Sequence, residues 1–366
     1  MKFLLIVDSF RGGAGNVMQI LAGALSRRGH QITLLLLNGA IDAPKHDLQG
    51  VTVVEYPLVQ KESAITPIGR LWRYKKAVKR LIKQYSPDAV LSFLTEYNGL
   101  TAWSVGGKLP LVISERNNPF QEQVRPQWNL LRKRYYHKAD RLVVQCSAFV
   151  DFYPERVKRK ICVIQNPILK PSATAVDRSA SAVRMVSMGR LNHQKNYPWM
   201  IEAACRIHAR VPNFRLTIYG DGEEKDALLA LIAERKAESY ISLGGKTADP
   251  HGVLAESDIY LMTSDYEGFP NALSEAMAVG LPSVSRLCHN GLYDLVEDGV
   301  SGYLVAPDDM DQFVNYAVKL ATDPNFAKEM GNRARSVAER YGVSGITDQY
   351  EKALLEAVSC HSKGGK

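Results

Sequence analysis

The sequence predicts an α/β protein with two doubly wound domains, each a parallel sheet covered by helices, facing each other across a central cleft. Its 366 residues fit two domains at about 100–200 residues each. Short apolar runs alternate with helical patterns in both halves, which is typical of parallel sheets. The pattern breaks at Asn166-Pro167 and at the polar residues 170–182, which indicates a linker. We therefore expect an N-terminal domain at 1–168, a C-terminal domain at 169–343, and a helix at 344–360 that packs back on the first domain.

The first half alternates strands and helices from its beginning. A helical pattern with its apolar residues on one face spans 16–28 and ends at Gly29. A second helical pattern spans 68–85. Strands are expected at 3–8, 31–37, 51–56, 89–93, 111–114, 141–145 and 161–165.

The second half repeats the alternation without repeating the sequence. Strands are expected at 183–188, 215–220, 241–243, 259–263, 282–285 and 302–305. Helices are expected at 197–211, 223–236, 250–255, 272–279 and 293–296, and near 309–322 and 325–340. In such sheets, ligands bind at the carboxyl ends of the strands.

Composition and charge exclude several classes of protein. A hydrophobic content of 46% excludes wholesale disorder, and five scattered cysteines favour a reducing compartment over a disulfide framework. The apolar run 3–7 is too short for a signal segment, and no apolar stretch approaches the ~20 residues of a membrane span. Residues 1–170 hold 26 Lys and Arg against 12 Asp and Glu, whereas residues 171–366 carry a net charge of −6. We therefore expect a cytoplasmic protein whose first half has an anionic partner.

Two loops offer anion-binding chemistry. Gly12-Gly13-Ala14-Gly15 lies between the first strand and its helix, where glycines let the backbone approach a phosphate. A plain tight turn is an equal alternative, because the pattern is neither GxGxxG nor Walker A. Arg190 and Lys195 follow the first strand of the second half and could neutralise a diphosphate, although two cations are also consistent with a solvated loop.

The segment 264–282 carries the most specific pattern. Glu267 follows an apolar strand, and Glu275 lies eight residues later in a helix that must be at least half buried. A buried carboxylate needs a specific partner, such as vicinal hydroxyls. The amides near Asn271 and Ala272 offer a second anion site at the helix start.

Together these motifs resemble those of the family 4 retaining glycosyltransferases, which have the GT-B fold of two Rossmann-like domains. Residues 267–275 are similar to the family's Glu-x7-Glu signature, 189–196 to its diphosphate-binding pair, and Gly12-Gly13 to its N-terminal glycine turn. The order and the spacing agree over nearly the whole chain. Each motif alone is unspecific, whereas the three together are highly specific.

The resemblance implies a role for each residue. Glu267 would contact the donor sugar near its anomeric end, and Glu275 would hold the ribose hydroxyls. Arg190 and Lys195 would bind the donor diphosphate and stabilise the leaving group, and Gly13 would approach the donor from the first domain. The further donor contacts that it implies are the amides of Asn271 and Ala272, together with Gly268, Phe269 and Lys246.

The resemblance also implies the substrates and the mechanism. The donor would be a nucleotide sugar, with UDP favoured by family habit, and no cofactor is expected. No metal is expected, because two cations and a helix N-terminus can stabilise the leaving diphosphate. Asp308-Asp309 reads as a helix cap rather than a metal motif. Retention is thought to proceed on the front face, with the leaving phosphate helping to take the acceptor proton.

Two positions depart from the family pattern. Glu115 and Arg116 stand where many relatives carry a histidine that contacts the sugar, and they are retained only as cleft candidates. Asp294 stands where relatives often have a glutamate.

A basic amphipathic helix at 68–85 points to the acceptor. Its apolar residues recur at helical spacing, and it holds seven cations with no acid between them. Such helices lie against anionic lipid or a polyanion, although a core helix with a solvated basic face is the plain alternative. No nucleic-acid partner is expected, because no nucleic-acid motif accompanies it or the second basic cluster at 125–138. The helix also resembles that of family members that act on polyprenyl-diphosphate-linked glycans, including N-acetylgalactosamine transferases. The seven cations are Arg70, Arg73, Lys75, Lys76, Lys79, Arg80 and Lys83.

The sequence therefore predicts a retaining hexosyl- or N-acetylhexosaminyltransferase. It would move a sugar from a nucleotide donor to a lipid-linked glycan, at the inner face of the cytoplasmic membrane, in bacterial surface polysaccharide or glycoprotein glycan assembly. The alternatives are the same fold acting on a soluble acceptor, and a non-catalytic module that binds lipid or nucleic acid.

Overall fold

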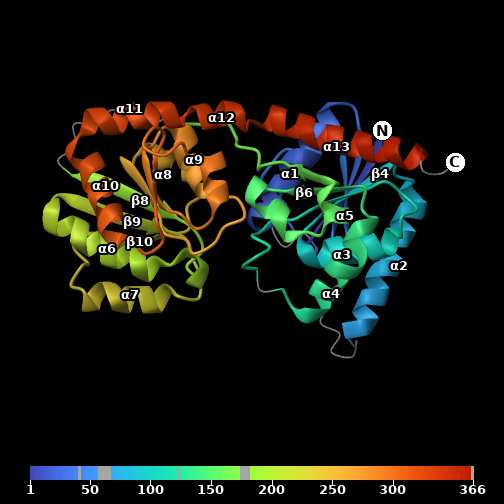
Figure 1. Cartoon of the computed structure of the whole chain (residues 1–366), viewed down its shortest axis with the longest axis horizontal. Helices are drawn as coiled ribbons and strands as arrows, with labels where there is room; N and C mark the ends of the chain where they lie inside the picture. The colour runs from blue at the N-terminus through green and yellow to red at the C-terminus, as the bar shows by residue number, and fades with distance from the viewer. Residues whose placement is uncertain (40–42, 57–66, 123, 174–181, 364–366) are drawn as a thin grey trace. The chain divides into compact units, whose positions relative to one another are not determined.

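The computed structural model describes residues 1–39, 43–56, 67–122, 124–173 and 182–363. The chain divides into two compact units (Figure 1). Unit 1 comprises Met1–Pro167 and Val343–Lys366, and unit 2 comprises Ile168–Gly342. The expected linker at 170–182 falls largely on residues 174–181, outside the described residues.

Unit 1 contains a seven-stranded parallel sheet in the order β3-β2-β1-β4-β5-β6-β7. All seven strands expected from the sequence are present, and their ends agree to within two residues. Their apolar side chains are buried because helices cover both faces of the sheet. The strands are β1 Lys2–Val7, β2 Gln31–Leu36, β3 Val51–Glu55, β4 Ala89–Phe93, β5 Leu111–Ser114, β6 Arg141–Val144 and β7 Ile161–Val163.

Two helices lie on each face of this sheet. α1 (Gly12–Arg27) and the C-terminal α13 (Val343–Lys363) pack on one face, and α2 (Pro67–Tyr85) and α3 (Thr95–Val105) on the other (Figure 1). An ion pair of 2.5 Å between Arg28 and Glu351 ties α13 to the end of α1. The remaining helices are α4 Pro126–Tyr135, α5 Glu155–Lys158, η1 Tyr136–Lys138 and η2 Ser147–Phe152.

The helix α1 begins at Gly12, four residues before the start expected from the sequence. Gly12 has φ +70°, which favours glycine, and a Cβ on Gly15 would lie 2.4 Å from the carbonyl oxygen of Ser9. The glycines therefore form the first helical turn rather than a loop before it. Glycines carry no apolar side chain, so the apolar periodicity of the sequence starts only at Val17 and does not reveal this first turn.

Unit 2 contains a six-stranded parallel sheet in the order β10-β9-β8-β11-β12-β13. The strands are β8 Val183–Met188, β9 Phe214–Tyr219, β10 Ile241–Gly245, β11 Ile259–Met262, β12 Ser283–Arg286 and β13 Tyr303–Val305. The prediction of two doubly wound α/β domains is therefore confirmed.

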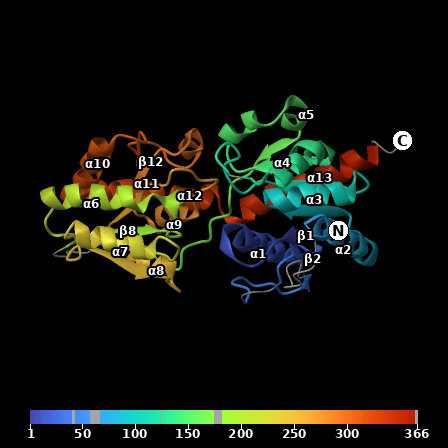
Figure 2. The same cartoon turned by 90° about the horizontal axis from the view of Figure 1, so that it is seen from below.

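Helices cover both faces of this second sheet as well. α6 and α10 pack together on one face, and α8 and α9 lie on the other. Figure 2 shows α6 and α7 side by side. Asp309 caps α10 as predicted, because its carboxylate accepts the Gln312 N–H at 2.9 Å. The elements are α6 Tyr197–Arg210, α7 Lys225–Glu234, α8 Pro250–Ala255, α9 Asn271–Val279, α10 Met310–Thr322, α11 Pro324–Ala334, α12 Ser336–Arg340, η3 His193–Lys195 and η4 Asn290–Asp294.

Two expectations for these helices need correction. The helix expected at 325–340 is two helices, α11 and α12, which meet at Arg335. The short helix expected at 293–296 is a 3-10 turn, η4, that begins three residues earlier because the His289 side chain accepts the Gly291 N–H.

Each sheet has one point where the strand order reverses. In unit 2 it lies between β8 and β11, which are hydrogen-bonded neighbours with Tyr260 opposite Val186. The loops that leave the carboxyl ends of these two strands therefore meet. In open α/β sheets this is where ligands bind.

Candidate active site

The loops after β8 and β11 are joined by backbone contacts at the strand-order reversal of unit 2. Lys195 ends the 3-10 turn η3 after β8. The Thr263 hydroxyl, just past β11, is 3.0 Å from the Lys195 carbonyl and 3.1 Å from the Asn196 carbonyl. The Gln194 side chain donates to the Tyr266 carbonyl at 2.8 Å. These hydrogen bonds fix the two loops against each other, and together the loops form one continuous surface.

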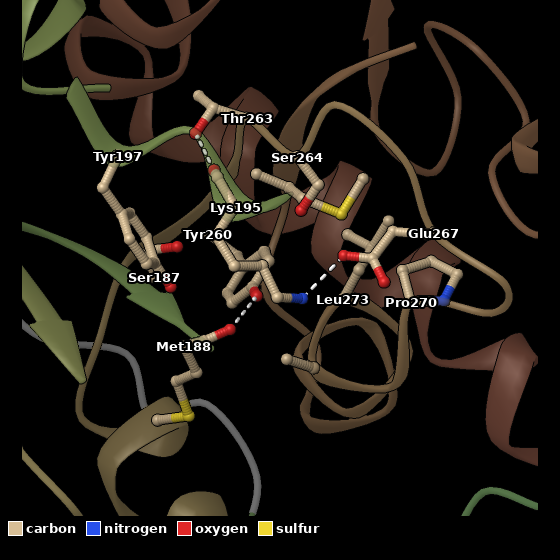
Figure 3. Close-up of a pocket in the computed structure, with 12 residues that line it drawn as sticks. Ser187, Met188, Lys195, Tyr197, Tyr260, Thr263, Ser264, Glu267, Pro270 and Leu273 are labelled. Carbon is tan, nitrogen blue, oxygen red and sulfur yellow. Dashed lines mark hydrogen bonds and ion pairs between the residues drawn. The ribbon is translucent and has the colours of Figure 1, made fainter. Parts of the chain in front are cut away.

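This surface brings Lys195 and Glu267 into contact (Figure 3). The Lys195 Nζ lies 2.6 Å from Glu267 Oε1, and the two side chains are only 20% and 8% exposed. A carboxylate this deeply buried is expensive unless it is paired, and Lys195 provides that pairing. The sequence predicted both residues as catalytic but assigned them separate contacts. Their mutual ion pair is a finding of the structure.

A small pocket surrounds this ion pair, and it is lined by buried apolar and hydroxyl-bearing side chains. Burial raises the pKa values of Tyr197 and Tyr260 well above the usual range of a phenol, so both remain neutral donors. The lining residues are Ser187, Met188, Lys195, Tyr197, Tyr260, Met262, Thr263, Ser264, Glu267, Pro270, Ala272 and Leu273.

The helix α9 begins beside this pocket. Its first-turn amides lack partners within the helix, which favours an anion there. The Asn271 N–H, however, donates to the Phe269 carbonyl at 3.0 Å, so Ala272 is the better placed of the two predicted amides. Gly268 and Phe269 are buried in the turn before the helix.

Glu275 lies about one turn from the start of α9. It is half-buried, and its charge, together with that of Glu267, contributes to the raised pKa of Tyr260. The charges of both acids of the Glu-x7-Glu pattern therefore act on one buried tyrosine.

Neither of the other two predicted donor-binding cations forms an ion pair with Glu267 in the described part of the chain. Arg190 is exposed on the loop after β8, and none of the ion pairs among the described residues involves it. Lys246 is 79% exposed and pairs with Asp221 at 3.1 Å, which lowers the Asp221 pKa. The structure thus brings together Lys195, Glu267 and the start of α9.

Unit 1 presents Gly13 at its surface, whereas the cleft candidate Glu115 is buried and the cleft candidate Arg116 is half-buried. Gly13 is exposed in the first turn of α1. Glu115 is only 1% exposed, and it accepts hydrogen bonds from the Tyr136 hydroxyl and from Thr95 Oγ1, the latter at 2.6 Å. The Arg116 guanidinium donates to the Tyr350 hydroxyl at 2.9 Å and to Asn166. In this structure both side chains hold the interior of unit 1 together.

The basic helix α2 has one buried face and one charged face. The buried face consists of Tyr74, Ala77, Val78 and Leu81. The cations on the exposed face are Arg73, Lys76, Lys79, Arg80 and Lys83, Lys75 is half-buried, and the Arg70 side chain lies outside the described residues. The helix therefore packs against the core of unit 1 with one face and exposes its cations on the other.

Aromatic side chains connect α2 to the second basic cluster. The Lys75 Nζ lies 3.9 Å from the ring centroid of Trp103 and 5.0 Å from that of Trp72, which is 51% exposed. Burial first, and then Lys79 and Lys138, lower the Lys75 pKa, so Lys138 in η1 lies near the same face. Lys138 of the second basic cluster therefore extends the charged face of α2, whereas Arg132 of that cluster is buried.

The described ranges contain neither a metal-ligand cluster nor a membrane-spanning helix. No group of three or more His, Cys, Asp or Glu side chains there is placed to hold a metal ion. No described helix has both the length and the apolar character that crossing a bilayer requires.

Sequence reasoning missed the polar residues that support the Lys195 loop. Thr263 and Asp265 each form a hydrogen bond with this loop, and Arg286 donates to Asp265. No local pattern marks them, because each partner lies more than 20 positions away in the sequence.

Comparison with known proteins identifies the family. The model for "Glycosyltransferase Family 4" matches residues 11–168, and that for "Glycosyl transferases group 1" matches residues 179–337. The chain belongs to the family 4 glycosyltransferases. The Glu-x7-Glu segment and the Lys195 loop both fall within the second match.

Individual relatives extend over the whole of this glycosyltransferase. It is 26% identical, over 97% of its length and 99% of the relative's, to a Campylobacter jejuni α-1,4-N-acetyl-D-galactosaminyltransferase named for a GalNAc-containing diphospho-undecaprenol substrate. Sucrose-phosphate synthase from Thermosynechococcus elongatus has a TM-score of 0.82 at 16% identity, covering 98% of this chain and 99% of that one. Anabaena HepE, solved with UDP and glucose, has a TM-score of 0.79 at 20% identity, covering 97% and 99%. The fold is GT-B, as the sequence predicted.

Proposed function

We propose that this glycosyltransferase moves a hexose or N-acetylhexosamine, with retention, from a UDP-sugar to a polyprenyl-diphosphate-linked glycan. The observation that carries the proposal is the Lys195–Glu267 pair at the start of α9, on the strand-order reversal of unit 2. A cation and free amides at one place suit a diphosphate. The lipid-linked acceptor is supported by the name of the Campylobacter relative, and UDP by the Anabaena structure.

The leaving diphosphate is the centre of the proposed mechanism. Negative charge develops on it as the glycosidic bond breaks, and donors already in place lower that barrier. When the donor binds, the Lys195 ammonium group would leave Glu267 and pair with a phosphate oxygen. The amides at the start of α9 would donate hydrogen bonds to the same diphosphate. The Glu267 carboxylate would then accept hydrogen bonds from the sugar hydroxyls, while Glu275 would accept hydrogen bonds from the ribose hydroxyls. Arg190, exposed on the same loop, would close over the diphosphate.

A donor panel tests the reaction. The protein is incubated with UDP-, GDP- and ADP-sugars and a polyprenyl-diphosphate glycan, and nucleotide release is followed. Release is expected with a UDP-sugar, and the anomeric configuration of the product, determined by NMR, should match that of the donor. EDTA should leave the rate unchanged, since no metal is proposed. Failure of every donor to release nucleotide, with a competent acceptor supplied, would contradict the proposal, and rescue of an EDTA-treated sample by Mn²⁺ would contradict its metal-free form.

We further propose that unit 1 docks on an anionic membrane surface, at the inner face of the cytoplasmic membrane. The support is the exposed basic face of α2, flanked by Trp72 and continued by Lys138. Each near-surface cation contributes about 1 kcal/mol of attraction to anionic lipid. Aromatic rings such as Trp72 are common at membrane interfaces.

A charge-removal variant tests this docking. Replacing Arg73, Lys76, Lys79 and Arg80 by Gln should abolish sedimentation with phosphatidylglycerol liposomes while leaving turnover on a detergent-solubilised acceptor unchanged. A raised acceptor KM in detergent would instead mean that the helix grips the acceptor diphosphate. The control replaces four exposed cations of unit 2 by Gln, which removes the same charge. Equal sedimentation of wild type and the α2 variant would contradict docking. The four control residues are Arg206, Arg210, Lys225 and Lys236.

A further inference from the structure

An ion pair between Asp265 and Arg286 lies next to the loop that carries Lys195. The Arg286 guanidinium donates to Asp265 Oδ1 and to the Pro307 carbonyl, so it joins the ends of β11, β12 and β13. Its side chain is only 12% exposed, and that of Asp265 is 29% exposed. Neither residue lines the pocket around Lys195 and Glu267. The pair therefore lies outside the lining of the pocket.

Asp265 is linked to the Lys195 loop through Asn196. The Asn196 side-chain amide donates to Asp265 Oδ1 at 3.0 Å, and the Asp265 N–H donates to the Gln194 carbonyl at 2.9 Å. Asp265 thus bonds to the residues on both sides of Lys195. Arg286 fixes the carboxylate that makes the first of these bonds.

The backbone of Asn196 explains why such support is needed. Asn196 has φ +49°, in the left-handed region, so the chain turns sharply immediately after Lys195. Asparagine adopts this region more readily than most residues, and the bond to Asp265 adds to that preference at Asn196. A lysine side chain has four flexible methylene groups, so the position of its backbone decides where the ammonium group can reach.

We propose that Asp265 and Arg286 are positioning residues that hold the Lys195 loop in the geometry needed for leaving-group stabilisation. This inference rests on the proposed role of Lys195. Asp265 accepts from Asn196 and Arg286, and the loop that carries Lys195 is fixed as a result. Misplacement of a catalytic group by about 1 Å can cost about 100-fold in rate, so the support matters kinetically.

The first experiment measures kcat and donor KM for Asp265→Asn. This variant keeps the side-chain shape but loses the charge that Arg286 needs. We expect kcat to fall about 10- to 100-fold, with a smaller change in donor KM. Asn196→Gly keeps the left-handed backbone accessible and removes only the bond to Asp265. It should lower kcat in the same direction, and it serves as the second variant if Asp265→Asn does not fold.

A comparable ion pair at the amino ends of the strands in the same sheet provides the control. Asp258 and Arg184 precede the buried parts of β11 and β8, lie 3.4 Å apart, and are about one-third exposed. Asp258 also accepts the Arg184 backbone N–H at 2.7 Å. Asp258→Asn should lower the Tm as Asp265→Asn does but leave kcat within about twofold. Equal kcat losses in both variants would mean that Asp265→Asn acts by lowering the general stability of unit 2, and this result would overturn the proposal.

A double-mutant cycle separates this inference from the proposed function. If Asp265 acts through Lys195, then Lys195→Ala together with Asp265→Asn is no slower than Lys195→Ala alone. Multiplied losses would show that Asp265 acts independently and would overturn the inference. Full activity of Lys195→Ala alone would instead contradict the proposed function. Loss of activity in Lys195→Ala with an unchanged Asp265→Asn would contradict only the positioning role.

Discussion

Two neighbouring carboxyl groups in unit 1, the buried Glu115 and the half-buried Glu122, should give this protein a measurable pH dependence of stability. The Thr95 hydroxyl lies 2.6 Å from Glu115 Oε2 and 2.8 Å from Glu122 Oε2. A hydroxyl has one proton to donate, so it satisfies one of these carboxylates at a time, which favours a proton on the other. Arg132, 4.0 Å from Glu122, opposes this protonation but does not outweigh burial. Burial, and then the charge of Glu115, raise the Glu122 pKa to about 7.

The size of the effect follows from this pKa. A tenfold change in an acid dissociation constant corresponds to about 1.4 kcal/mol, so a rise in the Glu122 pKa from 4.5 to about 7 amounts to about 3 kcal/mol. Because the folded pKa is raised, the folded state keeps a proton that the unfolded chain releases. The contribution is therefore fully present below about pH 4.5 and is lost as the pH rises to about 7. Its loss lowers the free energy of unfolding over that interval.

Glu122→Gln tests this reasoning, because an amide mimics the protonated acid and does not titrate. Urea unfolding, followed by tryptophan fluorescence, is measured from pH 4.5 to 8. The stability of the variant relative to wild type should increase by about 3 kcal/mol across that range. The exposed Glu155→Gln in the same unit is the control and should preserve the wild-type slope. Parallel curves for Glu122→Gln and wild type would refute the shared-proton account.

Two further predictions concern packing in unit 1. Gly15→Ala should lower the free energy of unfolding by about 2 kcal/mol, because its Cβ would meet the Ser9 carbonyl oxygen at 2.4 Å, whereas Gly13→Ala, on an exposed residue, should cost less stability. Urea titration of both variants checks this, and equal losses would contradict it. Tyr74→Phe should cost about 1 kcal/mol by removing the buried 2.6 Å hydrogen bond to Thr101, and an unchanged urea midpoint would argue against that bond.

The strands are predictable from the sequence because each depends on a short local pattern. The apolar runs at β4, β5 and β8 begin and end where expected. Glycine removes that signal, so the sequence predicts a loop where α1 makes its first turn. The burial of Glu115 is equally hidden, because its partners Thr95 and Tyr136 lie 20 and 21 positions away.

The candidate site is predictable as a set of residues but not as a geometry. Lys195 and Glu267 stand 72 positions apart, and they meet only because β8 and β11 are neighbours in the sheet. Strand order is a property of the whole chain rather than of a local segment. The same reason hides Asp265 and Arg286, whose function depends on which strand ends lie side by side.

A single substitution at Lys195 tests most directly whether this side chain stabilises the leaving diphosphate. UDP release from an active UDP-sugar is compared for wild type, Lys195→Ala and the control Lys225→Ala, an exposed lysine of unit 2. Lys195→Ala should lower turnover by about 10²–10³-fold, as loss of a transition-state donor does, while Lys225→Ala stays within about twofold. Turnover of Lys195→Ala within a few-fold of wild type, with an intact fold, would contradict the account.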